Sequence, residues 1–111
     1  MSGPRCRVPA AIAAAMPVGT VRQLEVPGCG ALALYRLADG FYATDDRCTH
    51  GEASLADGDV DGDEIVCPFH LGRFDIRTGN ATAAPCVTAL TCHRIVADAD
   101  GALIVEVATS R

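Results

Sequence analysis

The chain has no lysine and no tryptophan, and its aromatic side chains are limited to three Phe and two Tyr. Because half of its 111 residues are nevertheless hydrophobic, we expect an aliphatic core. All nine basic residues are Arg, and the 14 acidic residues outnumber them, which gives a net charge of −5. Proteins that bind nucleic acid neutralise phosphates with basic side chains, so this charge balance argues against that class.

Long hydrophobic runs are also missing, and none of the apolar stretches could span a bilayer. The Ala-rich stretch near the N-terminus has only seven residues between Pro9 and Pro17. This is short for a secretory signal, and it predicts a one-turn helix in a cytoplasmic protein. A length of 111 residues is typical of one domain, so we expect residues 1–111 to form a single domain.

Short segments of alternating apolar and polar residues are separated by turn residues, which is typical of an all-β domain. This alternation predicts strands with one buried side. Asp39-Gly40 and Asp100-Gly101 are expected hairpin turns. The segments that alternate, or that lead into a motif, are residues 24–26, 32–34, 41–43, 65–66, 74–77, 90–97 and 102–107.

The acidic residues are concentrated between positions 45 and 64, where eight of them face a single basic residue, Arg47. Such a run usually marks a solvated loop. A docking face that attracts a positively charged partner is the alternative, because a local excess of one charge steers association.

Two short Cys/His pairs lie sixteen residues apart, Cys48-Thr49-His50 and Cys67-Pro68-Phe69-His70. Without a convincing secretory signal, cysteines in such pairs favour metal binding over disulfides. Zinc could use two Cys and two His, but the common zinc finger pairs Cys with Cys and His with His. Mixed pairs are expected where two irons are bridged by sulfide and each loop sends one ligand to each iron. On that interpretation Cys48 and Cys67 hold the inner iron, and His50 and His70 hold the outer one.

These residues carry a resemblance to the Rieske-type [2Fe–2S] ferredoxins that serve bacterial aromatic ring-hydroxylating dioxygenases. The matching stretches are residues 33–36, 41–51, 67–74, 77–79 and 85–86. The resemblance implies the Rieske fold, a β-sandwich or barrel-like arrangement of antiparallel sheets. It also implies a small cluster-binding subdomain, about residues 46–86, made of the two ligand loops.

The neighbours of the four ligands fit the same resemblance. Gly51 and Gly72 would let the loop backbone approach the sulfides. Phe69 and Leu71 would shield the irons from water. In the family a third, proline-containing loop covers the cluster, and residues 84–86 match that loop.

The resemblance implies an electron carrier rather than an enzyme. It would take one electron from a flavin-dependent reductase and deliver it to the terminal oxygenase in aromatic hydrocarbon catabolism, most simply as a monomer. His50 and His70 would lie nearest the surface, and their ring protons would make the reduction potential fall at alkaline pH. The remaining thiols, of Cys6, Cys29, Cys86 and Cys92, are expected to be buried structural groups or spare thiols.

Three other classes of protein could contain such Cys/His pairs. An oxygenase large subunit needs a second iron held by two His and a carboxylate, and only His93, which we do not expect to be a ligand, remains outside the pairs. A Rieske-type small subunit of another reductase or oxygenase, such as a nitrite reductase, stays open. A zinc-stabilised binding module would be colourless, whereas a Rieske protein is red-brown.

Two features of respiratory Rieske proteins are missing. Those proteins carry an extra Cys in each ligand loop and a Ser just past the second His, where this chain has Leu71-Gly72-Arg73. Fewer hydrogen bonds to sulfur stabilise the reduced cluster less. We therefore expect a reduction potential near the low end of the Rieske range, roughly −150 mV.

Overall fold

The computed structural model describes residues 4–27, 30–49, 51, 53–68, 71–84 and 86–108. Strands dominate these residues, and all strand pairings are antiparallel, which confirms the expected all-β fold. Within these ranges, neither helix has the length and apolar character needed to cross a membrane. In chain order the elements are β1 (Arg5–Val8), α1 (Ala10–Ala14), β2 (Thr20–Val26), β3 (Gly30–Leu37), β4 (Gly40–Asp45), the 3₁₀-helix η1 (Leu55–Asp57), β5 (Asp59–Asp61), β6 (Glu64–Val66), β7 (Arg73–Asp75), β8 (Ala81–Ala83), β9 (Cys92–Ala97) and β10 (Leu103–Glu106).

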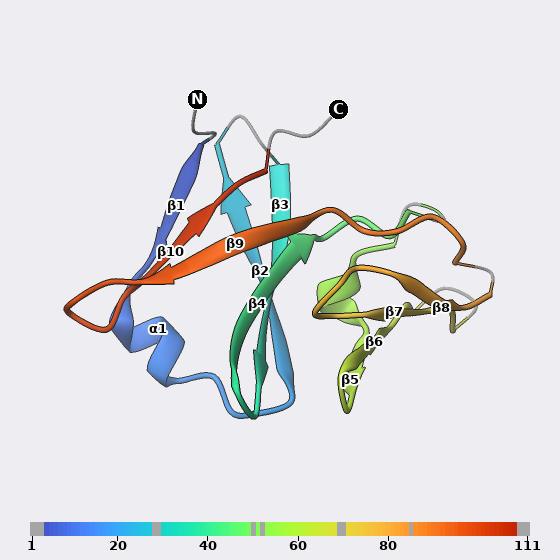
Figure 1. Ribbon diagram of the computed structural model, residues 1–111, viewed down its shortest axis with the longest axis horizontal. Coiled ribbons are helices and arrows are strands. Elements are labelled where there is room, and N and C mark those ends of the chain that lie inside the picture. The colour runs from blue at the N-terminus through green and yellow to red at the C-terminus, as the bar shows by residue number, and fades with distance from the viewer. Residues whose placement is uncertain are drawn as a thin grey trace.

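The larger sheet has six strands in the order β1-β10-β9-β4-β3-β2 and is curled, as Figure 1 shows. Val8 of β1 and Val26 of β2 come from its two edge strands, yet both belong to one buried apolar cluster. The same cluster includes Ala13 of α1, the short helix predicted from the sequence. The curl therefore encloses an aliphatic core, as a barrel-like sheet does.

Strand β3 differs from the expectation of one buried side. Leu32 and Leu34 point into the curled sheet, as their alternation predicted. Ala33 and Tyr35, on the opposite face, are fully buried as well and belong to a second apolar cluster. Alternation could not reveal this, because a strand covered on both faces shows little contrast between its two sides.

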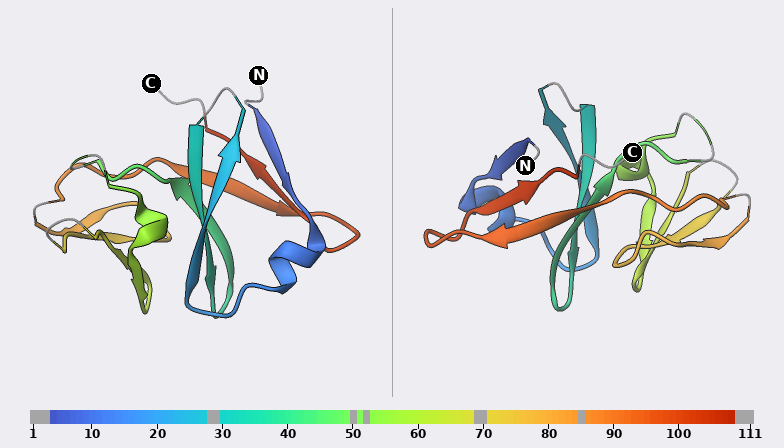
Figure 2. Two further views of the ribbon diagram at one scale, coloured as in Figure 1. Left: turned by 180° about the vertical axis from the view of Figure 1, so that it is seen from behind. Right: turned by 45° about the horizontal axis from the view of Figure 1, so that its top comes forward.

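The smaller sheet covers that second face. It has four strands of three residues each, in the order β5-β6-β7-β8, and lies at one end of the molecule (Figures 1 and 2). Ile65 of β6 and Phe74 of β7 are fully buried in the cluster that also contains Tyr35. The two sheets therefore share one apolar interface.

The hairpins lie close to their expected places. Gly40 already pairs with Leu37, so the first turn begins one residue earlier than predicted. The hairpin about Asp100-Gly101 joins β9 to β10 as expected, and Leu103 and Val105 are buried on one face. Strands β1, β5 and β8 were not predicted, because three or four residues are too few to establish a period.

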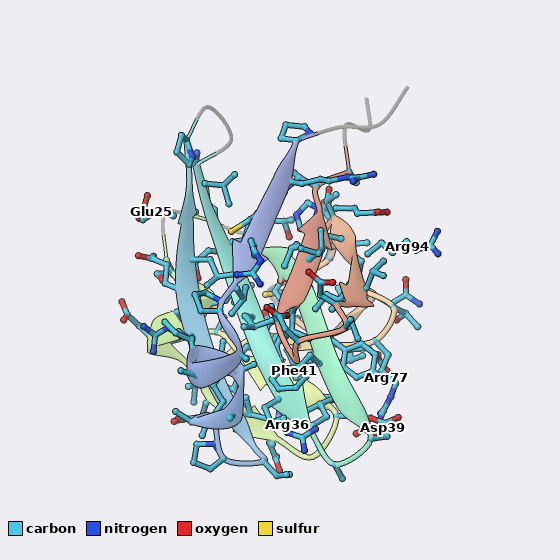
Figure 3. The ribbon with its side chains drawn as sticks, turned by 90° about the vertical axis from the view of Figure 1, so that its left-hand side faces the viewer. Glu25, Arg36, Asp39, Phe41, Arg77 and Arg94 are labelled. Carbon is cyan, nitrogen blue, oxygen red and sulfur yellow. The ribbon has the colours of Figure 1, made fainter. Side chains whose placement is uncertain are left out.

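Arg77 connects the two sheets. Its guanidinium donates hydrogen bonds to Asp39 (2.9 Å) and to the Tyr42 hydroxyl (3.2 Å) at the β3–β4 hairpin. The same guanidinium forms an ion pair of 2.6 Å with Asp63, between β5 and β6. Figure 3 shows Arg77 and Asp39 side by side, with Arg36 beside Phe41 nearby. Polar contacts thus join the hairpin to the small sheet.

Candidate metal centre

The first predicted ligand loop follows β4 and is closed at its base by backbone contacts. Arg47 forms an antiparallel bridge with Ser54, and the Cys48 amide donates to the Ala53 carbonyl (3.0 Å). A further amide, of Gly51, donates to the Cys48 carbonyl (3.2 Å). These contacts turn the chain tightly around Cys48, whose side chain is buried.

Asp46 holds the base of this loop from inside. Its carboxylate accepts hydrogen bonds from Gln23 Nε2 (2.8 Å), Ser54 Oγ (2.6 Å) and the Ala56 amide (2.9 Å). The side chain is almost fully buried, so an unpaired carboxylate there would be costly. Sequence reasoning placed Asp46 in the acidic run and missed this role, because nothing distinguishes it there from its acidic neighbours.

The second predicted ligand loop joins β6 to β7. The Cys67 amide donates to the Gly72 carbonyl (2.7 Å), and the Cys67 side chain is fully buried. Leu71 has a positive φ of 60°, which is rare for a residue with a side chain, and it is 68% exposed. Its expected role in shielding the irons stays a prediction.

The third loop, between β8 and β9, completes the neighbourhood. Cys86 is buried, and its Sγ lies 3.7 Å from Cys48 Sγ. Thr49 Oγ1 donates to the Thr88 carbonyl (2.6 Å), so this loop is also tied to the first one. Burial and the neighbouring thiols of Cys48 and Cys67 raise the pKa of Cys86 to about 12. The expectation that Cys86 is buried is confirmed.

The structure thus brings two of the four predicted ligands, Cys48 and Cys67, to buried positions beside the same third thiol. His50 and His70 lie outside the described residues, as do Phe69 and Cys29. Buried thiols at the ends of two tight loops suit soft metals and iron–sulfur clusters, which are bound through thiolates. The donor chemistry that the structure does describe therefore fits the predicted group.

His93, which is not expected to be a ligand, has hydrogen-bond partners at both ring nitrogens. Its Nδ1 accepts a hydrogen bond from the Ala108 amide (3.0 Å), and its Nε2 lies 2.8 Å from Asp45 Oδ1. Since Nδ1 accepts, Nε2 carries the ring hydrogen and donates a hydrogen bond to Asp45. Burial raises the pKa of the thiols of Cys6 and Cys92, which are half-buried and free.

The acidic run is less uniform than its sequence suggests. Arg73 pairs with Asp61 (2.9 Å) and Glu64 (3.1 Å), while Arg77 pairs with Asp63. Part of the local negative charge is therefore neutralised by arginines from β7 and the turn that follows it. A docking role for the rest of the run stays a prediction.

Comparison with known families gives one match. The model of the Rieske [2Fe–2S] domain matches residues 6–94. Ferredoxin CarAc of Metapseudomonas resinovorans is 51% identical over 75 residues, which is 68% of this chain and 70% of the relative. The ferredoxin component of the p-cumate 2,3-dioxygenase system of Pseudomonas putida is 54% identical over 69 residues, 61% of this chain and 58% of the relative.

Solved structures agree with these matches. A chain in a complex of reduced oxygenase and oxidised ferredoxin in carbazole 1,9a-dioxygenase has a TM-score of 0.85 and 42% identity, over 92% of both chains. The carbazole 1,9a-dioxygenase ferredoxin of Nocardioides aromaticivorans has a TM-score of 0.83 and 33% identity, over 94% of this chain and 98% of that one. A nitrite reductase small subunit of Mycobacterium tuberculosis reaches a TM-score of 0.81 at 15% identity, which shows a common fold alone.

Proposed function

This chain belongs to the Rieske [2Fe–2S] domain family, and we propose that it carries electrons to the terminal oxygenase of an aromatic ring-hydroxylating dioxygenase. It is a ferredoxin with one Rieske-type [2Fe–2S] cluster, an electron carrier rather than an enzyme. The observation that carries the proposal is the 51% identity to a dedicated ferredoxin, together with the near-complete overlap with a chain of an oxygenase–ferredoxin complex.

We assign the cluster to Cys48, His50, Cys67 and His70, within a cluster-binding subdomain of about residues 46–86. The burial of both cysteines and the tight loop around each of them support this assignment. When bound, the cluster stores one electron by alternating between two ferric ions and a ferrous–ferric pair. The chain keeps Cys48 and Cys67 away from water and places both beside Cys86 of the third loop.

The partners follow from the same proposal. A flavin-dependent reductase supplies the electron in the cytoplasm, and the terminal oxygenase receives it. The chain acts as a monomer that meets each partner in turn. Its surface beside the ligand loops exposes Leu71 and Val87, the latter to 82%, which provides apolar area close to the site.

The two alternatives have less support. The nitrite reductase small subunit shares the fold at only 15% identity, which says nothing about activity. The mixed Cys/His pairs disfavour a zinc site. The match to the Rieske model, which spans both pairs, also favours an iron–sulfur cluster.

Reconstitution tests the proposed role. The purified holoprotein would be combined with NADH, a flavin-dependent ferredoxin reductase and the oxygenase of a carbazole or naphthalene dioxygenase system. We expect product formation only when this chain is present, and none with the cluster-free Cys67→Ser variant. A holoprotein that the reductase reduces but that neither oxygenase reoxidises would contradict the proposed partner.

A further inference from the structure

Three buried thiols meet at the base of the ligand loops, although only two of them belong to the ligand motif. Cys48 and Cys67 come from the two ligand loops, whereas Cys86 comes from the third loop. The Sγ atoms of Cys86 and Cys48 are 3.7 Å apart, within hydrogen-bonding distance for two sulfur atoms. Cys86 therefore has a direct route to influence a ligand without being one.

The third loop holds this thiol firmly in place. The Cys86 amide donates to the Ala83 carbonyl (3.2 Å), which fixes the backbone at the residue itself. A Cβ on Gly72 would come within 2.3 Å of Cys86 Sγ, so the second ligand loop touches the thiol through its glycine. The thiol is thus enclosed between the first and second ligand loops and has little room to turn away.

The direction of the hydrogen bond follows from the chemistry of the two groups. A cysteine that ligates a metal does so as a thiolate, which can only accept. Cys86 lies outside the ligand motif, and the S–H of a thiol that binds no metal can donate; its Sγ is 3.7 Å from that of Cys48.

We propose that Cys86 is a positioning residue whose S–H donates a hydrogen bond to Cys48 Sγ and thereby raises the reduction potential of the site. The proposal rests on the proposed ligand role of Cys48. Hydrogen bonds to ligand sulfur stabilise the reduced state, which carries one more negative charge. The same contact links the third loop to the first ligand loop.

Two substitutions separate this role from simple packing. Cys86→Val fills a similar volume but has no donor, whereas Cys86→Ser offers a stronger O–H donor in the same place. Protein-film voltammetry of the cluster-loaded proteins should show a lower potential for Cys86→Val than for the parent, and a higher one for Cys86→Ser. The matched control is Cys92→Val, which removes a half-buried thiol in β9 and should leave the potential unchanged.

Iron and acid-labile sulfide are measured on each protein so that only loaded samples are compared. A loaded Cys86→Val protein with the parent's potential would overturn the proposal, because the thiol would then only fill space. If Cys86→Val does not hold the cluster, Cys86→Ser decides alone, and a potential at or below the parent's overturns the proposal. A parent protein without any cluster would instead refute the proposed function itself.

Discussion

The two sheets of this protein are stabilised in different ways. The curled six-stranded sheet has strands of four to eight residues around an aliphatic interior that includes Leu34 and Val105. The four-stranded sheet has strands of only three residues, and polar side chains such as Asp46 and Arg77 connect it and its loops to the rest. Both ends of the molecule bury apolar surface, but the ligand-bearing end relies in addition on specific polar contacts and, by our proposal, on the cluster.

The largest difference between the two sheets is expected when a cluster ligand is removed. Cys67→Ser replaces a buried thiolate donor, so we expect no bound iron, no acid-labile sulfide and no visible colour. Amide hydrogen exchange should then accelerate in β6 and β7, while β1 and β10 keep their protection. The six-stranded sheet would remain folded, since its core does not include the ligand loops.

Cys6→Ser is the matched control, since it changes a half-buried thiol in β1, on the six-stranded sheet. It should retain the full cluster. Loss of the cluster in this control as well would mean that general destabilisation, rather than ligand loss, explains the first result.

A large truncation in the core of the six-stranded sheet should instead lower the stability of the protein and leave the cluster unchanged. Leu34→Ala removes a fully buried side chain from the interior of the curled sheet and should lower the free energy of unfolding by about 3 kcal/mol. The EPR spectrum and the reduction potential of the folded protein should stay as in the parent. Val96→Ala, at a position 36% exposed on β9, should cost less than about 0.5 kcal/mol.

Asp46→Ala affects the ligand-bearing end, and it should lower the free energy of unfolding less than Leu34→Ala does. It removes a carboxylate that accepts three hydrogen bonds, and we expect a loss of about 2 kcal/mol in the free energy of unfolding. Unlike Leu34→Ala, it should release the cluster faster under a chelator, as followed by the decay of visible absorbance. Equal release rates for the two variants would show that Asp46 does not hold the first ligand loop.

The smallest effect is expected for the exposed connection between the sheets. A hydrogen bond from Arg77 lowers the pKa of Asp39 below its ordinary value of 3.8. The contact therefore stabilises the folded protein fully at pH values above 3.8. The contribution is lost as the pH falls through the lowered pKa of the folded state. Arg77→Gln should therefore have a lower Tm than the parent at neutral pH, and the difference should shrink at acidic pH and at high salt.

Arg94→Gln serves as its control, because Arg94 is 78% exposed and lies 3.9 Å from Glu106 in a weak ion pair. Thermal unfolding followed by circular dichroism measures both variants. If the Tm difference between Arg77→Gln and the parent did not change with pH or salt, the stacking of Arg77 on Tyr42, rather than the charge of Arg77, would account for the stabilisation.

The sequence predicted the six-stranded sheet better than the four-stranded sheet and its ligand loops. Alternation correctly placed Leu103 and Val105 on a buried face, and the Asp100-Gly101 turn joined the expected hairpin. Alternation could not predict that the other face of β3 is covered too, because the covering strands are three residues long and too short to show a period.

At the site, the ligand spacing identified Cys48 and Cys67 as candidate ligands, and both are buried, but it did not predict what surrounds them. Asp46 is one acidic residue among eight in its stretch, and only the folded chain shows its three donors. Cys86 likewise looks like a spare thiol until the third loop brings it to within 3.7 Å of Cys48 Sγ. Such contacts join positions far apart in the chain, where local pattern carries no signal.

The central claim is that two Cys and two His side chains hold a single [2Fe–2S] cluster. Pulsed EPR of the dithionite-reduced protein, labelled with ¹⁵N at histidine, tests it most directly. We predict a rhombic signal with couplings to two imidazole nitrogens bound to one iron. Stoichiometric zinc with no acid-labile sulfide, or a cluster signal without these nitrogen couplings, would contradict it.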